Sequence, residues 1–366
     1  MDGDVVLVIV VATALVFDFT NGFHDTANVV ATSISTHALS PRVAVGMAAL
    51  LNFAGAFISI QVAATIASDV VDAGAITPTV IFAGLVGAIS WNLITWYFGL
   101  PSSSSHALIG GVVGAVIAAV GTAAVDGEGI LGKVLIPAVL APIVAFVIGA
   151  LAIILAYRIC GRLRPGPVTR GFRLGQVVSG GLLALAHGTN DAQKTMGVIT
   201  LALIANGNLP DTGFDVPTWV IVSSASAIAL GTYTGGWRII RTMGTRIIKM
   251  DSAQGFSAQG AGAAVILASS HFGYPLSTTQ VIAGGVMGAG AGKRVSAVRW
   301  GVAGNIVAAW FLTLPAAAAI GAVCYGFTSI FGDGAAGPVI LSGLAILLGL
   351  TLFAQRIRRG QPVPTV

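Results

Sequence analysis

Two acidic residues stand inside apolar stretches of the chain, and each belongs to a short motif that occurs twice. Asp25 lies in GFHDTAN (residues 22–28) and Asp191 in GTNDAQK (residues 188–194), 166 positions further on (191 minus 25). An ionisable group at membrane depth is costly and marks a functional site by default. The glycine in each motif predicts a break in the helix, where freed carbonyl oxygens join the carboxylate around a cation.

A carboxylate surrounded by amide and carbonyl oxygens suits Na⁺, and the same carboxylate, once desolvated, can carry a proton. We therefore predict a coupling-cation site, meaning a site for an ion that crosses the membrane together with a substrate. It would be formed by His24, Asp25, Asn28, Asn190 and Asp191. The site would hold a metal ion, Na⁺ at Asp25 and Asp191, only if the protein is coupled to Na⁺. The alternative is that the two acids form structural ion pairs, for example with Lys194, and the duplication makes this the weaker interpretation.

A second pair of motifs is rich in hydroxyl groups. GLPSSSSH (residues 99–106) and GYPLSTTQ (residues 273–280) are related by an offset of 174 (275 minus 101). A helix that starts after such a turn directs free N–H groups and a positive dipole end at whatever lies before it, and hydroxyls add neutral donors. Two facing tips would bind an oxyanion such as phosphate. The predicted anion-binding residues are Ser103, Ser104, Ser105, His106, Ser277, Thr278 and Thr279. The alternative is plain N-capping, for which one hydroxyl suffices.

The composition indicates the environment in which these motifs work. Hydrophobic residues make up 55% of the 366 residues and charged residues 8%, whereas soluble domains carry about 25% charged residues. The chain is therefore expected to be an integral membrane protein, multi-pass in the cell's inner (plasma) membrane. Its basic residues form short clusters between apolar spans, as orientation signals do, so we expect no nucleic-acid partner.

The elements that must position the motifs are predicted to be helices only. Each hydroxyl-rich turn is read as the tip of a re-entrant-type helical hairpin whose two arms leave on the side they entered. Placing the basic clusters in the cytoplasm puts the N-terminus outside and makes the two halves inverted repeats with broken helices. The predicted units are residues 1–157 (first inverted repeat), 158–173 (basic cytoplasmic linker), 174–326 (second inverted repeat) and 327–366 (an additional membrane helix and cytoplasmic tail).

Both pairs of motifs resemble those of the PiT family of inorganic phosphate transporters, and WNLITWYFGLP (residues 91–101) is similar to its bacterial low-affinity subgroup. The resemblance implies symport of phosphate, in the bacterial subgroup also as a neutral metal-phosphate complex, with H⁺ or Na⁺, by a homodimer in a lipid bilayer. It implies alternating access and no enzymatic cofactor. The family pattern has Asn at His24 and Lys194 and often His at Gln280. We favour H⁺ because His24 adjoins Asp25.

Three other functions remain open from the residues alone. Sulfate is the nearest rival substrate, because hydroxyls and helix ends bind any tetrahedral dianion. An intramembrane aspartyl protease needs two membrane acids, which Asp25 and Asp191 could supply, but proteolysis leaves the twin hydroxyl tips unexplained. A channel is the third alternative, although paired carboxylates in two halves suit a transporter better. We therefore expect the protein not to be an enzyme.

Overall fold

The protein is helical throughout the part of the chain that the structure describes. The computed structural model describes residues 2–210, 214–332 and 334–358, and within these ranges it has no β-strand longer than one isolated bridge. The α-helices are α1 (Asp2–Ser35), α2 (Pro41–Gly55), α3 (Gln61–Ser68), α4 (Pro78–Phe98), α5 (Ser104–Val120), α6 (Gly127–Gly129), α7 (Ile136–Cys160), α8 (Pro165–Ala205), α9 (Thr218–Thr234), α10 (Trp237–Arg241), α11 (Ser252–His271), α12 (Thr278–Lys293), α13 (Trp300–Ser329) and α14 (Ala336–Arg358). The predicted all-α class is confirmed.

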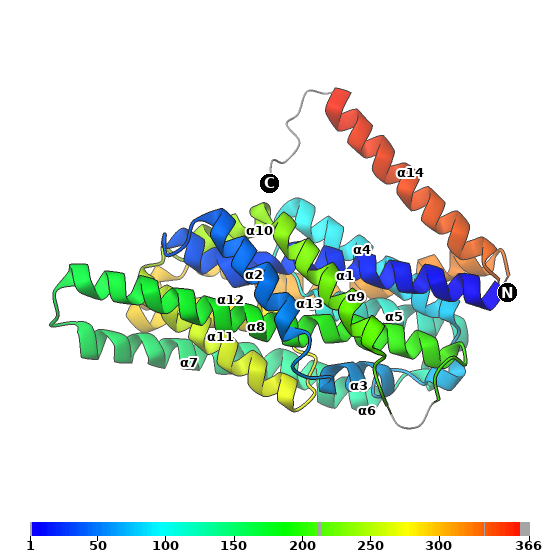
Figure 1. Ribbon diagram of the computed structural model, residues 1–366, viewed down its shortest axis with the longest axis horizontal. Coiled ribbons are helices and arrows are strands. Elements are labelled where there is room, and N and C mark those ends of the chain that lie inside the picture. The colour runs from blue at the N-terminus through cyan, green and yellow to red at the C-terminus, as the bar shows by residue number, and fades with distance from the viewer. Residues whose placement is uncertain (1, 211–213, 333, 359–366) are drawn as a thin grey trace.

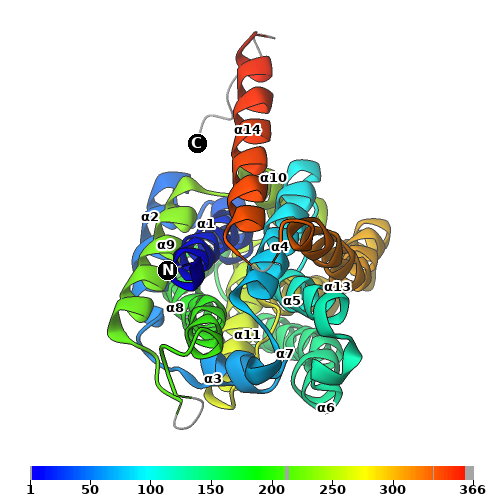
Figure 2. The same cartoon turned by 90° about the vertical axis from the view of Figure 1, so that its right-hand side faces the viewer.

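Most of the long helices run roughly along the longest axis of the molecule, whereas α14 is inclined to it (Figure 1). Within the described residues, four are long and apolar enough to cross a membrane: Gly3–Ser35, Pro78–Phe98, Gly127–Cys160 and Trp300–Ser329. A full crossing needs about 20 apolar residues. Seen along the axis, these helices form one bundle from which α14 projects (Figure 2). The fold is thus that of an integral membrane protein.

The helix breaks predicted at the two acidic motifs are absent. Both α1 and α8 continue unbroken through their motifs. The glycines serve close packing instead: a Cβ on Gly22 would lie 2.4 Å from the Ile228 carbonyl oxygen of α9, and one on Gly188 would lie 2.1 Å from that of Asn52 in α2. Glycine is favoured where two helix backbones must approach closely in lipid. Helix α1 of the first half therefore packs against α9 of the second half, and α8 of the second half packs against α2 of the first.

Two helical hairpins, α4–α5 and α11–α12, carry the hydroxyl-rich turns at their tips. Gly99 and Gly273 have φ angles of 66° and 75°, the left-handed conformation in which glycine commonly ends a helix. The next helices begin at Ser104 and Thr278, with Ser103 and Ser277 as their N-caps. The first hairpin packs against α13 and the second against α7, so each contacts the last long helix of the other half.

Two of the predicted units, the basic segment 158–173 and the C-terminal unit 327–366, can be compared with the helices of the structure. Of the basic segment 158–173, residues up to Cys160 belong to α7 and residues from Pro165 onward to α8, because proline readily starts a helix at its first position. The additional C-terminal helix corresponds to α14, while the predicted tail beyond Arg358 lies outside the described residues. The assignment of the units to inverted repeats stays a prediction.

Candidate functional site

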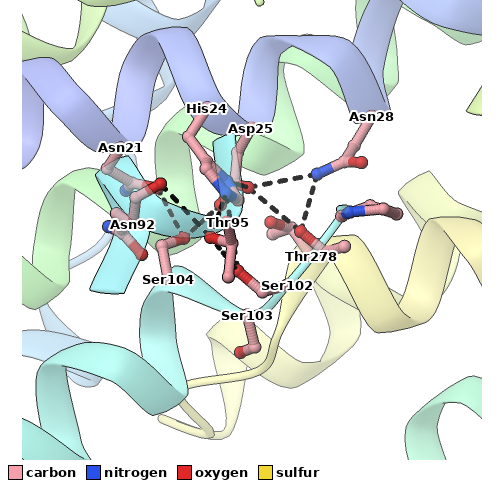
Figure 3. Close-up of polar contacts among 12 residues, drawn as sticks. Asn21, His24, Asp25, Asn28, Asn92, Thr95, Ser102, Ser103, Ser104 and Thr278 are labelled. Carbon is pink, nitrogen blue, oxygen red and sulfur yellow. Dashed lines mark hydrogen bonds and ion pairs between the residues drawn. The ribbon is translucent and has the colours of Figure 1, made fainter. Parts of the chain in front are cut away.

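Asp25 lies in the C-terminal third of α1 and receives hydrogen bonds from the tips of both hairpins. Ser104 donates to its Oδ2 atom, and Thr279 donates to its Oδ1 atom at 3.0 Å. From α1 itself, the Nδ1 atom of His24 lies 2.8 Å and the Nδ2 atom of Asn28 lies 3.2 Å from Oδ1. Figure 3 shows Ser104 and Asn28 reaching Asp25 from different elements. One carboxylate thus connects α1 with the N-terminal ends of α5 and α12.

Asp191 occupies the corresponding place in α8. The ammonium Nζ of Lys194 lies 2.5 Å from its Oδ1 atom, and Thr278 donates to its Oδ2 atom at 3.2 Å. The Nε2 atom of His187, one turn earlier, is 3.1 Å from Oδ2. All four side chains are at most 1% exposed. The ion pair with Lys194 that the sequence offered as an alternative therefore exists, inside a larger polar cluster.

The two acidic residues meet at the centre of the bundle. Asp25, His187 and Asp191 each offer one ligand atom, and these atoms lie within 4.8 Å of one another. Because charged groups removed from water need partners, two carboxylates this close require cations or protons. His24, His187 and Lys194 are the cationic or protonatable side chains that contact them among the described residues.

The contacts obey the internal repeat almost residue for residue. By the two offsets, Ser104 corresponds to Thr278, and each donates to the acid of its own half. Asn28 corresponds to Lys194, and each contacts a hydroxyl of the opposite tip, Thr279 at 2.7 Å and Ser105 at 2.5 Å. The site is therefore built of two similar half-sites that share their tips.

The tip hydroxyls divide into two kinds. Ser103 and Ser277 accept hydrogen bonds from the backbone N–H groups of His106 and Gln280, at 3.1 and 3.3 Å, which is the capping role. Ser104, Ser105, Thr278 and Thr279 instead contact the acids or their partners. In the first kind the hydroxyl oxygen accepts from the backbone and its O–H donor is left over, whereas in the second kind the hydroxyl is already part of the network around the two acids.

Two predicted residues lie beside this centre rather than in it. Asn190 donates to Ser270 at 2.9 Å and to the Tyr274 carbonyl at 3.2 Å, and it makes no hydrogen bond to either acid. The Nδ1 atom of His106 lies 3.4 Å from the amide nitrogen of Gln280, its counterpart in the second tip. The two hairpin tips therefore contact each other through His106 and Gln280.

Sequence reasoning did not single out several polar residues of the site. Asn21 accepts a hydrogen bond from Ser104 at 2.7 Å, and Thr95 and Ser102 lie within 3.2 and 3.5 Å of the Nε2 atom of His24. The repeat offers a signal for one more, because the offset of 166 carries Asn21 onto His187. Asp18 is fully buried in α1, and within the described part of the chain neither of its carboxylate oxygens has a hydrogen-bond partner.

Comparisons with known proteins agree with this arrangement. The sequence profile described as "Phosphate transporter family" matches residues 21–169 and again residues 162–321, once in each half. The chain is 55% identical over 354 residues to a Mycobacterium bovis protein named "Probable low-affinity inorganic phosphate transporter", covering 96% of this chain and 84% of that one. A Bacillus subtilis protein of the same name is 46% identical over 323 residues, covering 88% and 96%.

One solved structure has the same fold. It is titled "The sodium-dependent phosphate transporter", and it superposes with a TM-score of 0.79 over 88% of this chain and 98% of its own. The two sequences are 24% identical. At this identity the likeness establishes the fold alone.

Proposed function

The chain belongs to the phosphate transporter family, and from this premise we propose that it is a secondary symporter that carries inorganic phosphate together with a cation. The observation that carries the proposal is the hydrogen bonding of Asp25 by both hairpin tips, through Ser104 and Thr279. The group suited to a cation and the groups suited to an oxyanion are thereby parts of one network.

This network provides a physical reason for coupled transport. While Asp25 is ionised, the tip hydroxyls donate to its carboxylate, and its negative charge repels an incoming phosphate. Neutralisation of Asp25 by a cation removes the repulsion and weakens the hold on Ser104 and Thr279. These hydroxyls, together with the N-terminal ends of α5 and α12, can then bind the oxyanion. Cation and phosphate thus favour each other's binding, each raising the affinity for the other by the same factor, so the two ligands tend to be carried together.

A proton is the coupling ion that this chain favours over Na⁺. The nearest basic group to Asp25 is the imidazole of His24, at 2.8 Å. Histidine can exchange a proton near neutral pH, so the pair can pass one between two adjacent groups. An amide at this position would instead have offered an oxygen ligand to Na⁺.

The remaining structural predictions belong to the same proposal. We infer that residues 1–157 and 174–326 are inverted repeats with the N-terminus outside, that the two hairpins enter and leave on one side each, and that the protein is a homodimer of the inner membrane. The matching contacts of the two half-sites support the repeat, and the arrangement of basic loops supports the orientation.

The protease alternative is weakened by the partners of the two acids. In an aspartyl protease the two catalytic carboxyl groups share one proton, because two negative charges so close together disfavour the ionisation of both. Asp191 instead has the ammonium of Lys194 at 2.5 Å as its partner. Sulfate stays the rival substrate, since the tips offer hydroxyl and N–H donors to any tetrahedral dianion.

Uptake by the purified protein in proteoliposomes tests the proposal. Labelled phosphate should enter Na⁺-free vesicles when the outside is acidic, and entry should stop when an uncoupler collapses the gradient. Excess unlabelled phosphate should compete, whereas sulfate should not. Uptake that requires Na⁺ at fixed pH and is unaffected by the uncoupler would overturn the assignment of the proton as coupling ion. Competition by sulfate would overturn the assignment of phosphate as the specific substrate.

A further inference from the structure

The ammonium group of Lys194 is enclosed by three oxygen atoms at the centre of the bundle. Its Nζ atom lies 2.5 Å from the Asp191 carboxylate, 2.5 Å from the Ser105 hydroxyl and 2.8 Å from the Leu276 carbonyl oxygen. The side chain is 1% exposed. Since an ammonium has three donors, each is used once, and the charge is fully enclosed by protein.

These partners are the oxygen types that a small hard cation takes from a protein: a carboxylate, a hydroxyl and a backbone carbonyl. The three come from three different segments, namely α8, the start of α5 and the turn before α12. A simple structural ion pair needs only the carboxylate. The arrangement instead resembles a cation site in which the positive charge is attached to the chain.

The first half-site differs at the corresponding position. Asn28 places an amide there, and its Nδ2 atom contacts Asp25 at 3.2 Å and Thr279 at 2.7 Å. The amide is neutral and also has a carbonyl oxygen, which accepts no hydrogen bond from the residues that the structure describes. Among the described residues, Asp25 therefore contacts no lysine or arginine and has a ligand oxygen nearby, whereas Asp191 is paired with the ammonium of Lys194.

We propose that Lys194 is a tethered cation that occupies the second half-site in place of a mobile ion, so that only the Asp25 half-site takes up a coupling cation. The inference rests on the proposed symport, and it specifies the number of cations that the symport uses. Lys194 is thus a residue that determines the stoichiometry of transport. It also supplies one fixed positive charge beside the tips that bind the oxyanion.

The inference is tested by measuring how phosphate uptake depends on cation concentration. Initial rates are taken in proteoliposomes against external Na⁺ and against external pH, for the wild-type protein, Lys194→Asn and Lys194→Met. Lys194→Asn recreates the amide of Asn28, with an oxygen to offer, whereas Lys194→Met fills the volume without charge or ligand. The wild type should show a Hill coefficient of about 1 for its coupling cation, because the Hill coefficient is bounded by the number of sites.

Lys194→Asn should acquire a saturable stimulation of uptake by Na⁺ that neither the wild type nor Lys194→Met shows. The reason is that removing the ammonium leaves Asp191 as an uncompensated buried charge, which needs a new cation. A purely structural role would lower the thermal stability of both variants and leave the cation dependence of Lys194→Asn unchanged, and that result would overturn the inference.

Two further outcomes are decisive. If Lys194→Asn does not fold, the wild type alone decides: a Hill coefficient near 2, the limit for two mobile cations, contradicts a tethered one. If the wild type takes up no phosphate under any gradient, the proposed function itself fails. That failure is distinguishable, because it appears before any variant is compared.

Discussion

Removal of single tip hydroxyls separates ligand binding from helix capping. We predict that Ser104→Ala and Thr279→Ala each raise the KM for phosphate, because their hydroxyls donate to Asp25 at the centre of the site. Ser103→Ala and Ser277→Ala should raise it less and chiefly lower stability, because the oxygens of these hydroxyls cap backbone N–H groups. A hydrogen bond to a charged ligand is worth about 1.5–3 kcal/mol. The expected rise in KM is therefore about 10- to 150-fold.

The size of this effect should depend on pH, and the structure gives the direction. In the ionised state the same hydroxyls donate to Asp25, so a variant lacking one loses a hydrogen bond before phosphate binds as well as after. The two losses partly cancel. When the coupling cation, which in our proposal is a proton, neutralises Asp25, the full loss falls on the phosphate complex. The ratio of variant KM to wild-type KM should thus be larger at acidic than at alkaline external pH.

The assay is the initial rate of labelled phosphate uptake at several external pH values, with the internal pH fixed. The capping variants are the matched controls, and each should lose about 0.5–2 kcal/mol of stability, seen as a lower unfolding temperature. Equal rises in KM for capping and non-capping variants, or a ratio that does not change with pH, would refute the proposed sharing of hydroxyls between Asp25 and phosphate.

Three other outcomes are expected. Asp25→Asn and Asp191→Asn should each abolish gradient-driven uptake in a folded, membrane-inserted protein, as judged by size-exclusion chromatography and flux, and normal uptake would remove the acids from the mechanism. Gly22→Ala should prevent stable assembly because its Cβ would lie 2.4 Å from a carbonyl oxygen of α9, whereas Gly46→Ala, with nothing within 4 Å, should express normally. The third outcome concerns Asp251, the N-cap of α11. Burial raises the pKa of its carboxyl group, but hydrogen bonds from Lys293 and Tyr157 outweigh this effect and hold the pKa below its ordinary value. Its stabilising effect should be complete above the unfolded pKa of about 3.9 and fall as pH drops through the folded pKa, so the unfolding temperature of the wild type should fall more than that of Asp251→Asn on acidification.

The sequence predicted the parts of the site better than their connections. Two repeated motifs led to Asp25, Asp191 and the hydroxyl turns because an acid or a row of hydroxyls in an apolar stretch is visible locally. The glycines were misread as breaks because close packing against Asn52 or Ile228 depends on a helix far away in sequence. For the same reason, the contact of Asp25 with both tips could not be read from the chain, since Thr279 is 254 residues away.

The crossed packing of the two hairpins bears on which parts of the molecule can move as rigid bodies. Because α4 and α5 lie against α13, while α11 and α12 lie against α7, each trio combines segments from both halves of the chain. A rocking motion that opened the centre to one side would therefore not separate residues 1–157 from residues 174–326. It would separate two bodies, each made of segments from both halves. If the two halves were expressed as separate polypeptides, they would have to associate before either hairpin could pack against its partner helix.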